Sequence, residues 1–266
     1  MDLSDIDFAE LYRRQMLRVN RQEKAPEYWD GRASAMSQRM SDSQYVRQFV
    51  ASLDLSDCAT LLDVGCGPGT IALTVAPRLA HVYGLDYSPG MLAAFAEEAR
   101  TRGLTEATPI LRAWEDDWSD VPVCDIVVAS RSTAVPDLEA AILKLGSKAR
   151  KRVYMSYPSD GRLPGDDVRH AIGRADASAP DYLCVVGILH HLGLHPTVGY
   201  LMTENRFGRC ADFADYLAKA TELLGPLSAE EAGRLETFFR ETGERARQEP
   251  TRWALFSWET GKHVPR

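Results

Sequence analysis

The chain has 266 residues, of which 45% are hydrophobic and 26% charged, so its composition excludes a disordered protein and suits one large domain. Its formal net charge of −7 argues against a partner bound through a phosphate backbone. The five cysteines contain no CxxC pair, which favours reduced thiols in a cytoplasmic protein over disulfides or a metal site. The longest apolar run, residues 183–189, is far shorter than the ~20 residues of a membrane span, and the acidic start is unlike a signal peptide.

The N-terminal part is predicted to be helical. Residues 7–19 and 43–53 place apolar side chains at helical spacing, and the stretch "EYWDGRASAM" lies between them. We expect residues 1–55 to form an N-terminal helical extension or lid, and residues 56–266 to form the main domain.

From residue 60 onward, predicted strands alternate with predicted helices. The expected strands are residues 60–64, 81–86, 108–114, 124–130, 151–157, 197–204 and 252–259. The expected helices are residues 70–80, 88–103, 137–149, 182–193, 212–224 and 228–248. This alternation is typical of an α/β protein with a doubly wound parallel sheet. Residues 158–195 and 210–248 are expected to form substrate-side or cap elements.

A glycine-rich loop follows the first of these strands in "LLDVGCGPGT". In a parallel sheet the ligand binds at the carboxyl ends of the strands, and glycines there let the backbone approach it closely. Asp86 ends the second strand, where a carboxylate can bind both hydroxyls of a ribose. The two features together predict an adenosine ligand.

The loop chemistry separates two kinds of adenosine cofactor. Dinucleotide sites carry G-x-G-x-x-G, whereas Gly65, Gly67 and Gly69 are spaced G-x-G-x-G. Asp63 lies at the end of the preceding strand, where its charge would repel a pyrophosphate and attract an ammonium group. S-adenosylmethionine, which carries an ammonium and a sulfonium and no phosphate, is therefore favoured over nicotinamide cofactors.

The motifs "LLDVGCGPGT" and "GLDYSPGML", with an acid near the end of the third strand, resemble the class I S-adenosylmethionine-dependent methyltransferases. The resemblance implies a Rossmann-like seven-stranded sheet of order 3-2-1-4-5-7-6, with the last strand antiparallel. It further implies S-adenosylmethionine as cofactor and S-adenosylhomocysteine as product. The cofactor-binding residues implied in this way are Asp63, Gly65, Cys66 and Gly67 at the methionine moiety, Asp86 at the ribose, Tyr87, Met91 and Trp114 or Glu115 at the adenine, and Tyr28 and Trp29 in a lid.

The segment after the fourth strand, "VVASRSTAV", is where this family places its acceptor chemistry. It contains neither a D/N-P-P-Y motif, which disfavours nucleic-acid amino methylation, nor a metal-binding aspartate, so no metal is expected. Ser130 and Arg131 would face the methyl group, and Arg131 can hold an anionic acceptor by a bidentate contact, or can be a structural or solvated residue.

Three histidines in "ILHHLGLHP" are further candidates. His190 and His191 point about 100° apart on a helix and do not easily share a metal, and Gly193 is expected to end the helix before His195. One of the three is a candidate general base on the acceptor side, and a helix C-terminus that favours histidines is the alternative.

These observations predict a cytoplasmic enzyme that methylates a small molecule without a metal, a nucleic-acid partner or a membrane. The acceptor atom (O, N, S or C) and a homodimer stay open. The alternatives are methylation of a protein or tRNA, and a non-catalytic S-adenosylmethionine-binding regulatory module.

Overall fold

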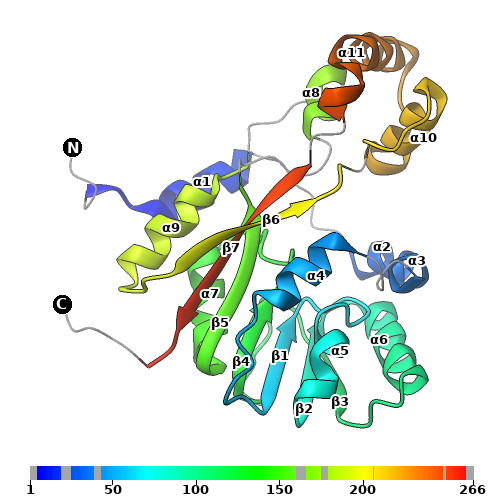
Figure 1. Cartoon of the computed structure of the whole chain (residues 1–266). Coiled ribbons are helices and arrows are strands. Elements are labelled where there is room, and N and C mark those ends of the chain that lie inside the picture. The colour runs from blue at the N-terminus through cyan, green and yellow to red at the C-terminus, as the bar shows by residue number, and fades with distance from the viewer. Residues whose placement is uncertain are drawn as a thin grey trace.

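The computed structural model describes residues 5–18, 25–38, 43–159, 166–174, 179–205, 207–247 and 250–261. Its centre is a seven-stranded sheet of order β3-β2-β1-β4-β5-β7-β6 (Figure 1). The strands are β1 (Thr60–Val64), β2 (His81–Asp86), β3 (Ala107–Leu111), β4 (Cys124–Ala129), β5 (Ala149–Pro158), β6 (Thr197–Thr203) and β7 (Thr251–Glu259). Strands β1 to β5 pair in parallel, and β7 is antiparallel to both β5 and β6. The predicted order and the antiparallel last strand are confirmed.

Helices cover both faces of this sheet. The helices are α1 (Phe8–Arg18), α2 (Pro26–Asp30), α3 (Ala33–Gln38), α4 (Gln44–Ala51), α5 (Ala72–Val75), α6 (Pro89–Thr101), α7 (Leu138–Ser147), α8 (Asp166–Ile172), α9 (Tyr182–His191), α10 (Phe213–Leu224) and α11 (Ala229–Arg247). Apolar residues of α1, α7 and α9 form one core with one face of the sheet, and those of α4, α5 and α6 form a second core with the other face. None of the helices in the described ranges is long and apolar enough to cross a membrane.

The helix starts follow local side-chain chemistry. Ser88 Oγ accepts a hydrogen bond from the Met91 amide, and Pro89 occupies the first turn of α6. Ser228 and Glu231 form a reciprocal capping box at the start of α11, with bonds of 2.7 and 3.2 Å.

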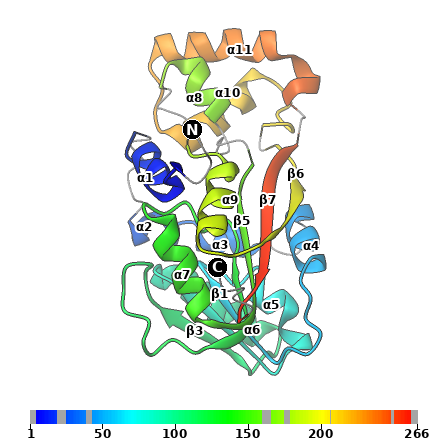
Figure 2. The same ribbon diagram turned by 90° about the vertical axis from the view of Figure 1, so that its left-hand side faces the viewer.

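Helices α8, α10 and α11 pack against one another and form a small cap with its own apolar cluster. Figure 2 shows this cap as a separate layer beyond the points where β6 ends and β7 begins. Arg174, which follows α8, links the three helices of the cap. Its guanidinium donates to both carboxylate oxygens of Glu231 in α11 and to the carbonyl of Leu224 at the end of α10. The pKa of Glu231 is lowered to about 2, chiefly by this hydrogen bonding with Arg174.

Two predicted elements differ from the structure. The helix expected over residues 70–80 is the single turn α5 followed by a 3₁₀ turn at Ala76–Arg78, because Pro77 has no amide hydrogen to continue an α-helix. The third strand ends at Leu111, so Trp114 lies in the loop beyond it.

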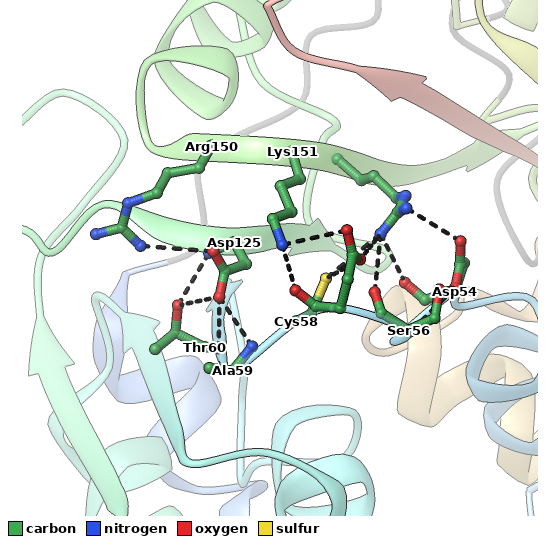
Figure 3. Close-up of polar contacts among 10 residues, drawn as sticks. Asp54, Ser56, Cys58, Ala59, Thr60, Asp125, Arg150 and Lys151 are labelled. Atoms are coloured by element: carbon green, nitrogen blue, oxygen red, sulfur yellow. Dashed lines mark hydrogen bonds and ion pairs between the residues drawn. The ribbon is translucent and has the colours of Figure 1, made fainter.

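A network of hydrogen bonds and ion pairs lies at the amino-terminal edge of the sheet (Figure 3). Asp125 accepts hydrogen bonds from the Ala59 and Thr60 amides at 2.8 and 3.1 Å. Arg152 pairs with Asp54 and Asp57, and this bonding lowers the pKa of the Asp57 carboxyl. The network anchors the segment before β1 and marks the edge opposite the glycine loop.

Candidate active site

The glycine loop leaves β1 at the carboxyl edge, and its three glycines serve different purposes. A Cβ on Gly65 would lie 2.3 Å from the Ser132 Cβ, and one on Gly69 would lie 2.6 Å from Leu73, so these two positions are bare because protein packs against them. A Cβ on Gly67 would find its nearest neighbour at 3.8 Å, and only the φ of +53° demands glycine there. The expected close approach of backbone to ligand therefore applies to Gly67.

Asp86, at the end of β2, binds the glycine loop directly. Its carboxylate accepts hydrogen bonds from the Gly67 amide at 2.8 Å and from the Ser88 amide at 2.9 Å. Burial raises the pKa of this carboxyl, against the lowering effect of those amides. The Tyr87 amide also bonds to this carboxylate. Carboxylate oxygens have about four acceptor sites in all, so acceptor capacity remains for a ligand hydroxyl.

Asp63 lies beneath the loop with one oxygen bonded and one free. Its Oδ2 accepts from the Ala72 amide at 3.1 Å, while the buried Oδ1 has no hydrogen-bond partner among the described residues. Burial, with the charge of Asp86 as a smaller cause, raises the pKa of Asp63 to about 7. An unpaired buried carboxylate oxygen is costly, which points to a cationic partner that the site is built to receive.

Two methionines lie beside Gly67: Met91, which the sequence predicts, and Met36, which it does not. Met91 of α6 is buried, and its sulfur would lie 3.8 Å from a Cβ on Gly67; the Met36 methyl of α3 would lie 4.0 Å from the same point. Two flexible apolar side chains thus flank the open side of the loop.

Helix α2 is bound to the start of α6 through Asp30, which the sequence analysis also missed. The Ser88 hydroxyl and the Gly90 amide donate to Asp30 Oδ1 at 2.6 and 2.8 Å. Tyr28 and Trp29, predicted as lid aromatics, lie half-buried on this helix with ring centroids 5.0 Å apart, and Arg32 stacks on Tyr28. The segment is therefore fixed next to the end of β2, where Asp86 lies.

Cys66 does not present its thiol to the loop's open side. The side chain is buried in the core, and its sulfur lies 2.9 Å from where a Cβ on Gly84 would stand. Burial raises the pKa of this thiol, so it is no nucleophile. Only its backbone can line a ligand.

The predicted adenine residues lie on the loops after β2 and β3. Tyr87 is half-buried beside Asp86, and Glu115 is exposed. Trp114 donates its indole N–H to the Ser132 carbonyl at 3.2 Å, which joins the loop after β3 to the loop after β4. Trp114 and Glu115 both stay predicted adenine contacts.

The loop after β4 is strained at Arg131. This residue has φ of +58°, a left-handed conformation that costs a non-glycine residue ~1–3 kcal/mol. Its amide donates to Ser156 Oγ at 2.9 Å, and its guanidinium carbon lies 4.3 Å from the ring centre of Tyr45. The guanidinium is exposed and has no carboxylate partner among the described residues.

Tyr45 of α4, a third residue missed from the sequence, completes this arrangement. It is 1% exposed, and its hydroxyl lies 2.6 Å from Ser156 Oγ and 2.9 Å from Ser130 Oγ. Burial raises its pKa, so the phenol is neutral at ordinary pH. Ser156 is a small polar residue in the buried second half of β5, after the apolar residues "VYM", and this position is the signal that could have revealed the cluster.

The histidines lie elsewhere. Helix α9 leads into Thr197, which pairs with Ser257, and Ser257 pairs with Tyr154 near the amino-terminal half of β5. His195 lines a pocket there with Arg152 and Asp54, which form an ion pair at the amino-terminal edge of the sheet. The structure therefore does not bring His190, His191 or His195 together with the glycine loop, and their placement does not support a role in acceptor binding.

The residues of the cleft fit S-adenosylmethionine. The unpartnered Asp63 oxygen suits an ammonium group, Gly67 leaves room beside Met36 and Met91, and Asp86 retains acceptor capacity for hydroxyls. None of these contacts requires a phosphate group on the ligand.

The comparisons with known proteins agree with this geometry. A family model described as "methyltransferase domain" matches residues 61–148. An uncharacterized protein of Haemophilus influenzae is 35% identical over 269 residues, which cover 98% of this chain and all of that one. Nocamycin O-methyltransferase of Saccharothrix syringae is 29% identical over 187 residues, covering 65% of this chain and 62% of its own. A methyltransferase from Thiobacillus denitrificans, solved with S-adenosylhomocysteine, superposes with a TM-score of 0.58 at 15% identity, covering 89% and 99% of the two chains.

Proposed function

Because this chain belongs to the class I S-adenosylmethionine-dependent methyltransferases, we propose that it transfers the cofactor's methyl group to a small-molecule acceptor without a metal. The observation that carries the proposal is the arrangement of two separate polar sites at one sheet edge. Asp63 and Asp86 form the cofactor side, and Ser130 and Arg131 follow the neighbouring strand β4.

On the cofactor side, each residue has a defined task. Asp63 binds the ammonium group through its free oxygen, and Asp86 binds the ribose while it holds the Gly67 amide. Met91 and Met36 pack beside the adenosine, and Tyr87 with Trp114 or Glu115 completes the adenine site. When bound, S-adenosylmethionine supplies a methyl group already activated by the sulfonium, so positioning is the main task of the protein.

On the acceptor side, the donor set favours an organic acceptor over a metal-bound one. Ser130, Tyr45 and Ser156 contribute neutral hydroxyls, and Arg131 contributes a positive charge. Divalent cations such as Mg²⁺ prefer carboxylate ligands, which this cluster does not offer, and the Arg131 charge would repel them. An anionic small molecule suits the same groups.

The cap of α8, α10 and α11 supports a small acceptor. It stands at the edge of the sheet where β5 ends and β7 begins, on the side of Ser130 and Ser156. A covered acceptor side suits a compact molecule better than a folded RNA. Parts of residues 158–195, which we expected to line the acceptor pocket, lie outside the described residues.

The first test is cofactor binding by calorimetry without added metal. S-adenosylmethionine and S-adenosylhomocysteine should bind, and NAD should not. The second test incubates the enzyme and labelled S-adenosylmethionine with a metabolite extract, bulk tRNA or total protein. Label in the metabolites supports the proposal. Label only in tRNA or protein would show that the acceptor is a macromolecule, and cofactor binding without any transfer would indicate a regulatory module.

A further inference from the structure

Three hydroxyl groups and one amide form a continuous hydrogen-bonded chain on the acceptor side. Arg131 N lies 2.9 Å from Ser156 Oγ, which lies 2.6 Å from the Tyr45 hydroxyl, which lies 2.9 Å from Ser130 Oγ. The distances alone do not say which hydroxyl donates to which. The amide at one end decides it.

A backbone amide can only donate, so Ser156 Oγ accepts from Arg131. Ser156 is fully buried, and its hydroxyl has Tyr45 as its one other partner among the described residues. The Ser156 proton therefore reaches an acceptor only at the Tyr45 oxygen. The opposite direction would leave that proton buried and unpaired, at the full cost of desolvation.

The direction of donation at Ser156 also sets the direction at Tyr45. The Tyr45 oxygen accepts the Ser156 proton, and the Tyr45 hydroxyl donates its own proton to Ser130 Oγ. Ser130 is half-buried at the carboxyl end of β4, and its proton is left to point away from Tyr45. Ser130 thus offers a hydrogen-bond donor to whatever occupies the acceptor side.

A second donor lies on the same tyrosine. The Arg131 guanidinium stacks on the face of the Tyr45 ring, 4.3 Å from its centre, while Ser130 touches the phenol oxygen. The Arg131 guanidinium and the Ser130 hydroxyl therefore contact the same side chain, Tyr45. A guanidinium and a hydroxyl donor together match an anionic oxygen.

The cluster offers no base. The Arg131 guanidinium carries only donors, Ser130 is oriented as a donor, and burial raises the pKa of Tyr45, so none of them takes a proton from an acceptor. Asp63 lies on the cofactor side, where we assign its free oxygen to the ammonium group of the cofactor. An acceptor that must lose a proton on methylation, such as an alcohol, finds no group in this cluster of described residues to receive it.

We propose that the methyl acceptor is a carboxylate, held by Arg131 and Ser130, and that the product is a methyl ester. The inference rests on the proposed function and names the acceptor class within it. A lone pair of the carboxylate oxygen bonds to the methyl carbon, the bond from that carbon to sulfur breaks, and its electron pair stays on sulfur. The sulfonium and carboxylate charges cancel, and no proton is released.

The test uses the full chain, labelled S-adenosylmethionine and an unfractionated metabolite extract, followed by mild alkali. An ester releases its label as volatile methanol, whereas ethers and methylated amines keep it. We expect alkali-labile label, with Arg131→Ala and Ser130→Ala lowering the transfer rate at least about tenfold while S-adenosylhomocysteine affinity stays within about threefold. Alkali-stable label overturns the carboxylate assignment and leaves the proposed function standing.

Tyr45→Phe tests the hydroxyl chain itself. It should lower transfer, because Ser156 and Ser130 lose their shared partner. Tyr12→Phe is the matched control: it removes another buried hydroxyl, which donates to the Val135 carbonyl at 2.9 Å, in the core on the other face of the sheet. Equal rates for the two variants would contradict the chain's role in aiming Ser130.

A binding measurement keeps the inference testable without turnover. Calorimetry should show that the complex with S-adenosylhomocysteine binds succinate and does not bind the neutral succinamide. Arg131→Ala should abolish succinate binding, and Arg131→Lys should retain part of it. Absence of Arg131-dependent succinate binding overturns the inference. Succinate binding with no transfer to any acceptor pool would instead overturn the proposed function.

Discussion

The Gly67 amide donates a 2.8 Å hydrogen bond to the carboxylate of Asp86, 19 residues later in the chain. This contact joins the loop after β1 to the end of β2, so the residue that we propose to bind the ribose also holds the glycine loop. Under this proposal, ribose binding and loop geometry are coupled through one carboxylate.

Replacement of Asp86 should weaken the cofactor complex. Asp86→Ala removes hydrogen bonds to a charged group, and we expect a loss of ~1.5–3 kcal/mol in the binding free energy of S-adenosylhomocysteine, measured by calorimetry. Glu97→Ala, on the exposed side of α6, is the control and should bind normally. Normal binding by Asp86→Ala would show that Asp86 only supports the loop.

Asp63 should make both stability and binding depend on pH. Its folded-state pKa of about 7 exceeds the ordinary 3.8, so the folded protein holds this proton more tightly than the unfolded chain does. The free energy of unfolding of the ligand-free protein should then fall as pH rises from about 4 to about 7, by at most ~1.4 kcal/mol per pH unit. Urea titrations across this range measure it.

Cofactor binding should show the opposite trend, because the ammonium group pairs best with the ionised carboxylate. The affinity for S-adenosylhomocysteine should rise up to about tenfold per pH unit and level off above about pH 7. Asp63→Asn should bind weakly with a flat profile. A native profile as flat as that of Asp63→Asn would assign the ammonium group to another partner.

The left-handed backbone at Arg131 predicts a conflict between stability and activity. Glycine adopts a φ of +58° without strain, so Arg131→Gly should be about 1 kcal/mol more stable to urea than Arg131→Ala, although both lose transfer activity. Asp57 has φ of +60° at the opposite edge and supplies the control pair. Asp57→Gly and Asp57→Ala should differ in stability in the same sense, with transfer activity retained.

The strand order and the position of the candidate cofactor site could be predicted because their signals are local. Asp63 and Asp86 lie at the ends of β1 and β2, the glycine loop follows β1, and the apolar residues of both strands are contiguous in the sequence. Tyr45 and Asp30 could not be found in this way, since each acts on a residue far along the chain: Tyr45 on Ser156, and Asp30 on Ser88. Contacts between distant segments leave no periodic pattern.

The structure lends the histidine prediction no support, for a reason of topology. Strand β7 runs antiparallel to both β5 and β6, so β6 starts at the same edge as β5. The chain must therefore return to the amino-terminal edge after β5, and α9 carries it there with His190 and His191 at its end. The predicted strand order already implied this return.

Asp30 should control how firmly the N-terminal segment covers the cofactor. Its carboxylate accepts from the Ser88 hydroxyl and the Gly90 amide at the first turn of α6, where the helix dipole favours a negative charge. A Cβ on Gly90 would lie 2.8 Å from the Asp30 Cα, so the two segments are in direct contact and no other residue fits at Gly90 without moving α2. The carboxylate is the polar part of that contact.

Asp30→Ala should therefore release α2 while the sheet stays folded. We expect faster cleavage by a protease within residues 25–38 and a loss of ~1–2 kcal/mol in S-adenosylhomocysteine binding, since Tyr28, Trp29 and Met36 lose their anchor. Asp30→Asn keeps one acceptor oxygen, so its cleavage rate and its S-adenosylhomocysteine affinity should lie between those of the native chain and Asp30→Ala. Saturating S-adenosylhomocysteine should slow the cleavage in the native chain more than in Asp30→Ala, because the bound cofactor and the Asp30 contact hold the same segment. Equal protection in both would mean that α2 covers the cleft without help from Asp30.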